Sequence, residues 1–213
     1  GLKEVARIQS LMDAIRVSTG FKGDAKAFLE FMRTDPRFYE GIPGHHMQIA
    51  IQTELTDIPL FRTQYGYSAF AEGWGLYAED LGKQMGSFTD PYNDFGRLSS
   101  ELWRAVRLVL DTGLHAKGWT EEEAVSWALA NSPRPEPSVR SEVRRYLLWP
   151  GQATTYKIGM LKIQALRDQA RAALGDRFDL RRFHDTVIGG GSMPLPVLEK
   201  RIAGWIEAQK AGQ

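Results

Sequence analysis

The feature that most constrains the fold of this chain is the helical spacing of its apolar residues from one end to the other. Residues 2–17 set the pattern, because Val5, Ile8, Met12 and Ile15 recur every three or four positions, as on one face of an α-helix. No run of residues alternates convincingly between apolar and polar, as a half-buried strand would. We therefore predict an all-α, or mainly helical, fold with helices at 2–17, 24–33, 43–56, 66–85, 92–116, 120 onward, 138–147, 151–174, 178–187 and 195–209.

Two local signals refine these predicted helices. Thr120 with Glu123 three residues later is a capping box and predicts a helix that starts there. Gly73 and Gly75 lie inside the predicted helix at 66–85, where each costs about 1 kcal/mol relative to alanine. Glycines retained at that cost suggest that another segment packs closely against the helix.

Composition limits the class of protein. A chain of 213 residues is most simply one mainly helical domain, here divided into an N-terminal helical segment at 1–39 and a core at 40–213. The net charge is only +1, and the Lys and Arg residues are spread along the chain rather than gathered in one basic segment. This argues against nucleic-acid binding. With no cysteine, a metal must be held by His, Asp or Glu. No apolar run reaches the roughly 18 residues of a membrane span, while localisation and oligomeric state stay open.

Glu40, His45 and His46 place a carboxylate beside two adjacent imidazoles, and half of the chain's 4 histidines lie here. Imidazole and carboxylate are zinc ligands, and a free carboxylate beside them can serve as general base on a metal-bound water. The cluster therefore predicts a metallohydrolase-like site. The alternative is a helix N-terminus whose histidine pair faces solvent.

The apolar residues that follow predict how the two histidines are oriented. Met47, Ile51 and Leu55 share one face of the predicted helix, and His46 lies nearer to that face than His45 does. We therefore expect His46 to point inward and His45 to point toward water.

Glu72 and Glu79 share one face of the predicted helix at 66–85, among Phe70, Trp74 and Tyr77. Glu72 follows the histidines by about one helix and a turn, so an antiparallel second helix would bring it to them as a third metal ligand. The alternative is that both glutamates are solvated, as glutamates on helices usually are.

A polar stripe formed by Arg104, Arg107, Asp111 and His115 follows one side of the predicted helix at 92–116. The rest of that helix is mostly apolar, so it is expected to be buried, and the stripe must pair internally or line a cavity. One interpretation is an internal Arg–Asp pair that closes a core. The other is a cavity in which Arg104 or Arg107 binds a substrate carboxylate.

Tyr146, Tyr156 and His184 complete the candidate residues. A tyrosine hydroxyl or an imidazole can donate a hydrogen bond to the oxyanion of a tetrahedral intermediate. The alternative, which the sequence alone favours, is that each of the three side chains is a packed ring whose polar tip is satisfied. Tyr146 joins Arg104 and Arg107 as a candidate substrate-binding residue.

Several segments together resemble the bacterial domain-of-unknown-function 885 family, which is grouped with zincin-like metallopeptidases. They are EGIPGHHMQ at 40–48, EGWGLYAE at 72–79, LWRAVRLVLDTGLH at 102–115, PGQATTYKIG at 150–159 and FHD at 183–185. These segments are specific in combination and span most of residues 40–200. The resemblance implies a helical zincin-like scaffold, zinc as cofactor and peptides as the substrate class.

The resemblance also implies roles for individual residues. Glu40 would be the general base, while His45 or His46 and Glu72 would bind the zinc. Tyr156, His115 or His184 would stabilise the oxyanion.

This chain departs from the family pattern in two ways. Family members usually have His directly before the glutamate of the first motif, where this chain has Tyr39. They are also much longer, and residues 28–39 resemble a family segment that normally lies well upstream of that glutamate. We therefore expect that an internal stretch, with one histidine ligand, is absent. A tyrosine, whose pKa is about 10, would weaken zinc binding at neutral pH.

Two functional hypotheses from different classes follow. The first is a zinc-dependent peptidase-like hydrolase, impaired by the tyrosine at position 39. The second is a catalytically inactive helical remnant that binds peptides or a partner protein through the former cleft. A helical structural module without a ligand is the third possibility, and it requires the Arg104–His115 stripe to be fully self-paired.

Overall fold

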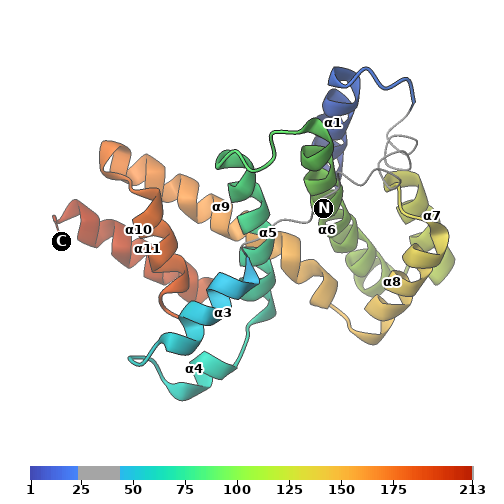
Figure 1. Cartoon of the computed structure of the whole chain (residues 1–213). Helices are drawn as coiled ribbons and strands as arrows, with labels where there is room; N and C mark the ends of the chain where they lie inside the picture. Colours follow the sequence, from blue (N-terminus) through green and yellow to red (C-terminus); the bar gives the residue numbers. More distant parts are fainter. Residues whose placement is uncertain (24–43, 213) are drawn as a thin grey trace. The chain divides into compact units, whose positions relative to one another are not determined.

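The computed structural model describes residues 1–23 and 44–212, and within these ranges it is helical without any strand (Figure 1). The mainly helical fold predicted from the sequence is confirmed. The predicted helix at 24–33 lies outside the described residues. The elements are α1 (Leu2–Ser18), α3 (His45–Glu54), α4 (Leu60–Gln64), α5 (Ser68–Gln84), α6 (Pro91–Lys117), α7 (Glu121–Asn131), α8 (Glu136–Leu148), η1 (Gln152–Thr154), α9 (Thr155–Leu174), η2 (Gly175–Arg177), α10 (Leu180–Ile188) and α11 (Leu195–Lys210).

The short helix α4 and the 3₁₀ turn η2 were not predicted, and one further helix starts later than predicted. A single turn, such as α4, is too short to show a periodic apolar pattern. The helix predicted at 151–174 begins with the 3₁₀ turn η1, and α9 follows from Thr155. Gly151 has φ 81° and cannot serve as a helical residue, which explains the later start.

Helix ends follow the polar signals of the sequence. The Asp90 side chain accepts a hydrogen bond from the Tyr92 N–H at the start of α6, and Gly118 ends that helix with φ 69°. The capping box of Thr120 and Glu123 at the start of α7 is present as predicted.

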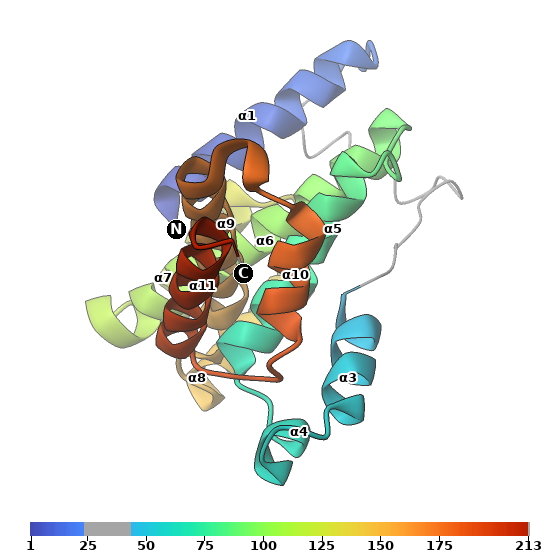
Figure 2. The same cartoon turned by 90° about the vertical axis from the view of Figure 1, so that its left-hand side faces the viewer.

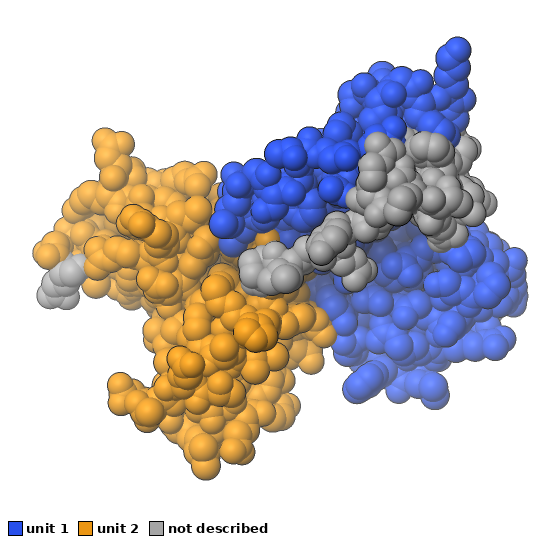
Figure 3. Space-filling view, in the orientation of Figure 1, with its two compact units in different colours: residues 1–42, 79–157 blue, residues 43–78, 158–213 orange. Residues whose placement is uncertain are grey.

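The chain divides into two compact units, coloured separately in Figure 3. Unit 1 comprises residues 1–42 and 79–157, and unit 2 comprises residues 43–78 and 158–213. Helices α5 and α9 each contribute residues to both units. The expectation of a single domain stays a prediction, since a division by internal contacts does not test independent folding.

Unit 1 is built around α6, against which α1, α7 and α8 pack (Figure 1). The strongly apolar sequence of α6 explains its central position. The core residues it contributes are Phe95, Leu98, Leu102, Trp103, Val106 and Leu110, all buried. Facing them are Val5, Ile8 and Met12 of α1, Ala124 and Ala128 of α7, and Val139, Val143 and Tyr146 of α8.

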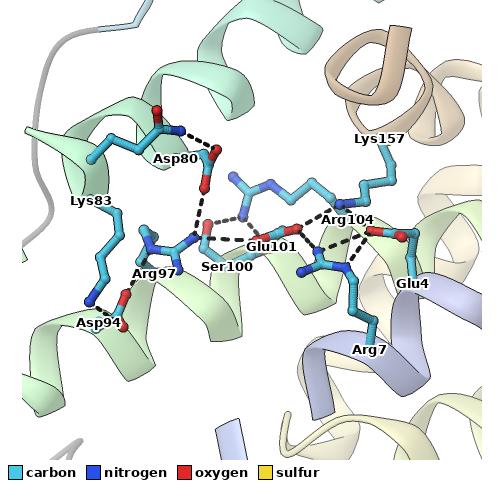
Figure 4. A network of polar contacts seen from close by, with 11 residues as sticks. Glu4, Arg7, Asp80, Lys83, Asp94, Arg97, Ser100, Glu101, Arg104 and Lys157 are labelled. Atoms are coloured by element: carbon cyan, nitrogen blue, oxygen red, sulfur yellow. Dashed lines mark hydrogen bonds and ion pairs between the residues drawn. The ribbon is translucent and has the colours of Figure 1, made fainter. Parts of the chain in front are cut away.

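Unit 1 also contains a buried network of charged side chains (Figure 4). Lys157 is 0% exposed, and its Nζ lies 2.7 Å from Glu101 Oε1 and 2.9 Å from Glu4 Oε2. Glu101 also pairs with Arg7 and with Arg97. Burial alone would raise the pKa of Glu4, but its hydrogen bonds with Lys157 and Arg7 outweigh burial and lower that pKa. The network is therefore mutually neutralised.

Unit 2 is held together by close helix contacts. A Cβ on Gly73 of α5 would lie 2.4 Å from Gly159 Cα of α9, so both glycines are needed where the two backbones meet. The close packing predicted from Gly73 is confirmed. Helices α10 and α11 pack side by side, and α3 contacts both α4 and α10 (Figure 2). Buried core residues of unit 2 include Phe70, Trp74, Tyr77, Met160, Ile163, Phe183, Val187, Leu198 and Ile202.

None of the helices in the described ranges combines the length and apolarity that crossing a membrane requires. This agrees with the expectation from the sequence.

Candidate functional site

The first candidate site joins His45, the first residue of α3, to Glu72 in the first half of α5. His45 Nε2 lies 3.3 Å from Glu72 Oε2. The His45 side chain is 50% exposed and that of Glu72 is 24% exposed. The structure therefore brings together two residues that the sequence places on different helices, in a position that solvent reaches.

Two glycines make this approach possible. A Cβ on Gly44 would lie 2.9 Å from Gly75 Cα, so the start of α3 lies directly against the α5 backbone. A Cβ on Gly75 would lie 2.7 Å from His45 Cε1 and 2.8 Å from His45 Nε2. The absence of a side chain at Gly75 therefore leaves room for the imidazole. This explains the second helical glycine that the sequence singled out.

The prediction that His46 points inward is wrong, since His46 is exposed and Met47 of the supposed inner stripe is 41% exposed. His45 is also exposed, as expected, but its imidazole contacts Glu72 of α5. The inward face of α3 is instead marked by Gln48, which is 3% exposed. Gln48 follows His45 by three residues and lies about 60° from it around α3, whereas His46 lies about 160° from Gln48.

Gln48 is a polar residue of this face that sequence reasoning missed. Both atoms of its side-chain amide are buried, and neither has a hydrogen-bond partner anywhere in the described part of the chain. Buried polar groups are nearly always hydrogen-bonded, so this exception marks the face as unusual. The sequence signal was its i+3 spacing from His45.

A second cluster of unit 2 surrounds His184 of α10. Its Nε2 lies 2.9 Å from the Tyr77 hydroxyl, and Arg167 donates to the same oxygen at 3.4 Å. The Tyr77 hydroxyl therefore accepts from Arg167 and shares a hydrogen bond with His184 Nε2. Burial, and then the nearby Arg167 charge, lower the pKa of His184 to about 4. The imidazole is therefore neutral at pH 7.

Trp74 connects the two clusters. Its indole N–H donates to the Gly44 carbonyl at 3.2 Å, next to His45, and its ring centroid lies 5.7 Å from that of His184. Glu72 and Trp74 both belong to α5. His45 and His184 therefore both lie against the part of α5 that carries Glu72.

The donor set fits zinc in part. With bonds of about 2.0–2.1 Å and a tetrahedral angle, two zinc ligand atoms lie roughly 3.3–3.4 Å apart. The 3.3 Å between His45 Nε2 and Glu72 Oε2 agrees with that spacing. A catalytic zinc needs three protein ligands, however, and residues 1–23 and 44–212 contain no group of three His, Cys, Asp or Glu placed to hold a metal. Glu40 and Tyr39 lie outside the described residues.

The polar stripe of α6 belongs to unit 1, and each of its members is bonded to a different partner. Arg107 donates to Glu142 Oε2 through Nε at 3.1 Å and Nη2 at 2.7 Å. The Asp111 carboxylate accepts from the Gly151 N–H at 3.0 and 3.1 Å. The internal Arg–Asp pair considered from the sequence is not found among the ion pairs of the described residues.

The other two members of the stripe bond locally. His115 is exposed, and its Nε2 lies 3.1 Å from the Tyr146 carbonyl oxygen. Arg104 donates to the Ser100 carbonyl at 3.2 Å and to its hydroxyl at 2.6 Å. Its Nε is buried and has no partner within the described ranges, so the stripe is not fully self-paired.

The tyrosines predicted to serve the site also lie in unit 1. Tyr146 is 0% exposed and donates to Glu142 at 2.8 Å, and burial raises its pKa. The ring of Tyr156 lies beneath Arg107 and Arg104, with centroid distances of 4.9 and 5.7 Å. Within unit 1, Tyr156 therefore groups with the two arginines, whereas the hydroxyl of Tyr146 is committed to Glu142.

Glu79, on the same helix face as Glu72, lies in unit 1. Burial raises its pKa, although the charge of Arg104 and a hydrogen bond with Ser100 act in the opposite direction. Glu79 therefore lies against the part of α6 that carries Arg97, Ser100 and Arg104.

Two solved structures are similar to this chain. The crystal structure of a "putative lipoprotein" from Colwellia psychrerythraea has a TM-score of 0.88 and 32% sequence identity, and the match covers 98% of this chain and 51% of that chain. A "putative lipoprotein of unknown function" from Shewanella oneidensis has a TM-score of 0.71 and 27% identity, covering 77% of this chain and 30% of that one. This chain therefore spans about half the length of the first protein and less than a third of the second.

A search of curated proteins gave no match. The family described as bacterial protein of unknown function (DUF885) matches residues 38–202, which include His45, Glu72 and His184. Because this match covers well over half of the sequence, the chain belongs to that family.

Proposed function

We propose that His45 and Glu72 form part of a zinc site and that the chain is a peptidase-like hydrolase built on that site. The observation that carries the proposal is the 3.3 Å between His45 Nε2 and Glu72 Oε2, which is the spacing of two ligands on one tetrahedral ion. The donors come from two helices, and Gly75 opens the space for the imidazole.

Bound zinc would activate water and polarise a carbonyl group. Glu40 is the general base that the family resemblance implies, and the remaining ligand must come from outside the described residues. His46 is the matched non-ligand of this proposal, since it is adjacent to His45 and forms no ion pair with Glu72.

We assign His184 a positioning role. Its Nε2 is occupied by the Tyr77 hydroxyl, and its ring packs against Trp74. Trp74 in turn holds the Gly44 carbonyl, which fixes the start of α3 and therefore the His45 imidazole. A neutral histidine suits this role, because a charged one would repel Arg167.

The second candidate function is an inactive peptide-binding remnant. The observation that favours it is that the described residues offer His45 and Glu72 but no third ligand. With Tyr39 in place of the histidine of the family motif, zinc binding would then be too weak to support turnover.

Turnover of a fluorogenic peptide library separates the two functions. The full chain would be assayed with one equivalent of zinc, in EDTA, and as the Glu72→Gln variant. The hydrolase proposal predicts zinc-dependent cleavage that falls at least a hundredfold in EDTA and in the variant. Peptide binding with no cleavage in any of these samples would instead support the inactive remnant.

A further inference from the structure

Arg134, in the loop between α7 and α8, is a partly buried cation that forms no ion pair with a described residue. Its guanidinium carbon lies 4.4 Å from the ring centroid of Trp103, on which it stacks. It makes no hydrogen bond or ion pair with any residue in the ranges that the structure describes. Trp103 itself is 1% exposed, and its indole N–H has no acceptor within those ranges. The Arg134 guanidinium and the Trp103 indole N–H, which are neighbours, therefore both lack an acceptor among the described residues.

Two further arginines lie close to this position. Arg104 and Arg107 both lie over the ring of Tyr156, and Arg104 forms no ion pair with a described residue. The pKa of Arg134 is lowered, first by burial and then by the charges of Arg107 and Arg104. Trp103 and Arg107 lie one turn apart on the same side of α6, so Arg134, stacked on Trp103, lies on the side of that helix that carries Arg107.

The nearby carboxylates do not balance these charges. Glu142 accepts hydrogen bonds from Arg107, from Arg145 and from the Tyr146 hydroxyl. Glu79 lies near Arg104, and although burial raises its pKa, the charge of Arg104 acts to lower it, so Glu79 is the carboxylate that partly opposes Arg104. Among the residues that the structure describes, Arg104 and Arg134 are thus the members of the cluster that form no ion pair.

We propose that Arg104, Arg107 and Arg134 form a binding site for an oxyanion, with the rings of Trp103 and Tyr156 as its apolar walls. The planar guanidinium group matches the two oxygens of a carboxylate or a phosphate, and three of them around one anion would offset their mutual repulsion. The same chemistry is offered by the C-terminal carboxylate of a peptide and by inorganic phosphate. The site is independent of zinc, because none of its residues is a proposed metal ligand.

Isothermal titration of the full chain in EDTA distinguishes these two sources. The probes are an N-acetylated tripeptide with a free C-terminal carboxylate, the same tripeptide as its carboxamide, and inorganic phosphate. We expect the carboxylate peptide to bind at least tenfold more tightly than the carboxamide. Tighter binding of phosphate than of the carboxylate peptide would retain the oxyanion site and assign it to phosphate. The proposal is overturned if neither anion binds or if both peptides bind equally well.

Variants identify the site. Arg134→Gln and Arg104→Gln should each weaken anion binding at least tenfold, and Arg134→Lys should restore part of it by retaining the charge. The matched control is Arg144→Gln, which removes an equal charge from a side chain that is 65% exposed and paired with Glu121. Circular dichroism confirms that each variant folds. Anion binding that survives both Arg134→Gln and Arg104→Gln would place the anion elsewhere and refute the site.

Discussion

In unit 1 the most deeply buried charged side chains pair with one another, whereas in unit 2 a histidine and a glutamate pair while partly exposed to solvent. Lys157 and Glu101 have side chains that are 0% and 4% exposed, and both are bonded to several partners. His45 and Glu72 have side chains that are 50% and 24% exposed, and a glycine gives the imidazole its space. The comparison separates charges that stabilise the fold from polar groups that are accessible to a ligand.

The difference follows from solvation. A buried charge must be neutralised by partners, because transfer out of water costs several kcal/mol per ion. A half-exposed pair keeps part of its hydration and contributes little to stability. We therefore expect substitutions in the network of unit 1 to affect stability, and substitutions at His45 or Glu72 to affect ligand binding with little effect on stability.

The largest expected effect is that of Lys157→Met, which leaves Glu101 and Glu4 without their central cation. Unfolding in urea should show a loss of about 3 kcal/mol, since the two carboxylates lose their most deeply buried partner and keep only Arg7 and Arg97. The control is Lys162→Met, whose side chain is 36% exposed and pairs with Glu199, and which should cost less than about 1 kcal/mol. Equal costs for the two variants would contradict the distinction between buried and exposed charge.

Gly159→Ala comes next and tests the backbone contact of unit 2. Its Cβ would lie 1.9 Å from the Ala69 carbonyl oxygen, so we expect a loss of about 2 kcal/mol or more from overpacking. Gly204 is an exposed residue of α11, and a Cβ added there would have no atom within 4 Å. Gly204→Ala should therefore stabilise the protein by roughly 0.5–1 kcal/mol. Thermal unfolding measures the stability of both variants. If both substitutions changed the stability in the same direction, the close contact of Gly159 with α5 would be refuted.

Tyr146→Phe removes a hydroxyl that donates to Glu142 at 2.8 Å from a fully buried ring. We expect it to cost about 1–2 kcal/mol, because the acceptor carries a charge. Tyr65→Phe is the control, since that ring is 60% exposed, and it should change stability by less than about 0.5 kcal/mol. Urea unfolding in which Tyr146→Phe matched the control would show that the hydroxyl is not needed.

The smallest expected effect is a pH dependence due to His184. Its pKa is lowered to about 4 in the folded protein from a usual 6.5. Between pH 6.5 and 4 the unfolded chain therefore binds a proton that the folded chain does not, and stability falls as the pH falls. The contribution is about 1 kcal/mol after allowing for partial exposure. His184→Gln should flatten the stability curve across this window, and an unchanged slope would contradict the assignment.

The fold was largely predictable because helical periodicity reports burial directly. The core face of α6 and the capping box at Thr120 follow from local sequence rules. The helix α4 was missed because one turn has no period, and Gly151 shifted the start of α9 through its positive φ. These features depend on backbone conformation that residue spacing does not encode.

The candidate site was predictable only in part. The sequence identified His45 and Glu72, and the glycine pattern indicated a close approach to α5. It could not orient the two adjacent histidines, because that depends on which face of α3 the rest of unit 2 covers. Arg134 was missed for a related reason, since its stacking on Trp103 joins a loop to a helix far away in the sequence.

The central claim is that His45, and not His46, binds metal with Glu72. Elemental mass spectrometry of the protein after dialysis against zinc tests it most directly, using the wild type, His45→Ala, His46→Ala and Glu72→Ala. We predict near-stoichiometric zinc in the wild type and in His46→Ala, and loss of zinc in the other two variants. Zinc that persists in His45→Ala, or that is absent from the wild type, would contradict the claim.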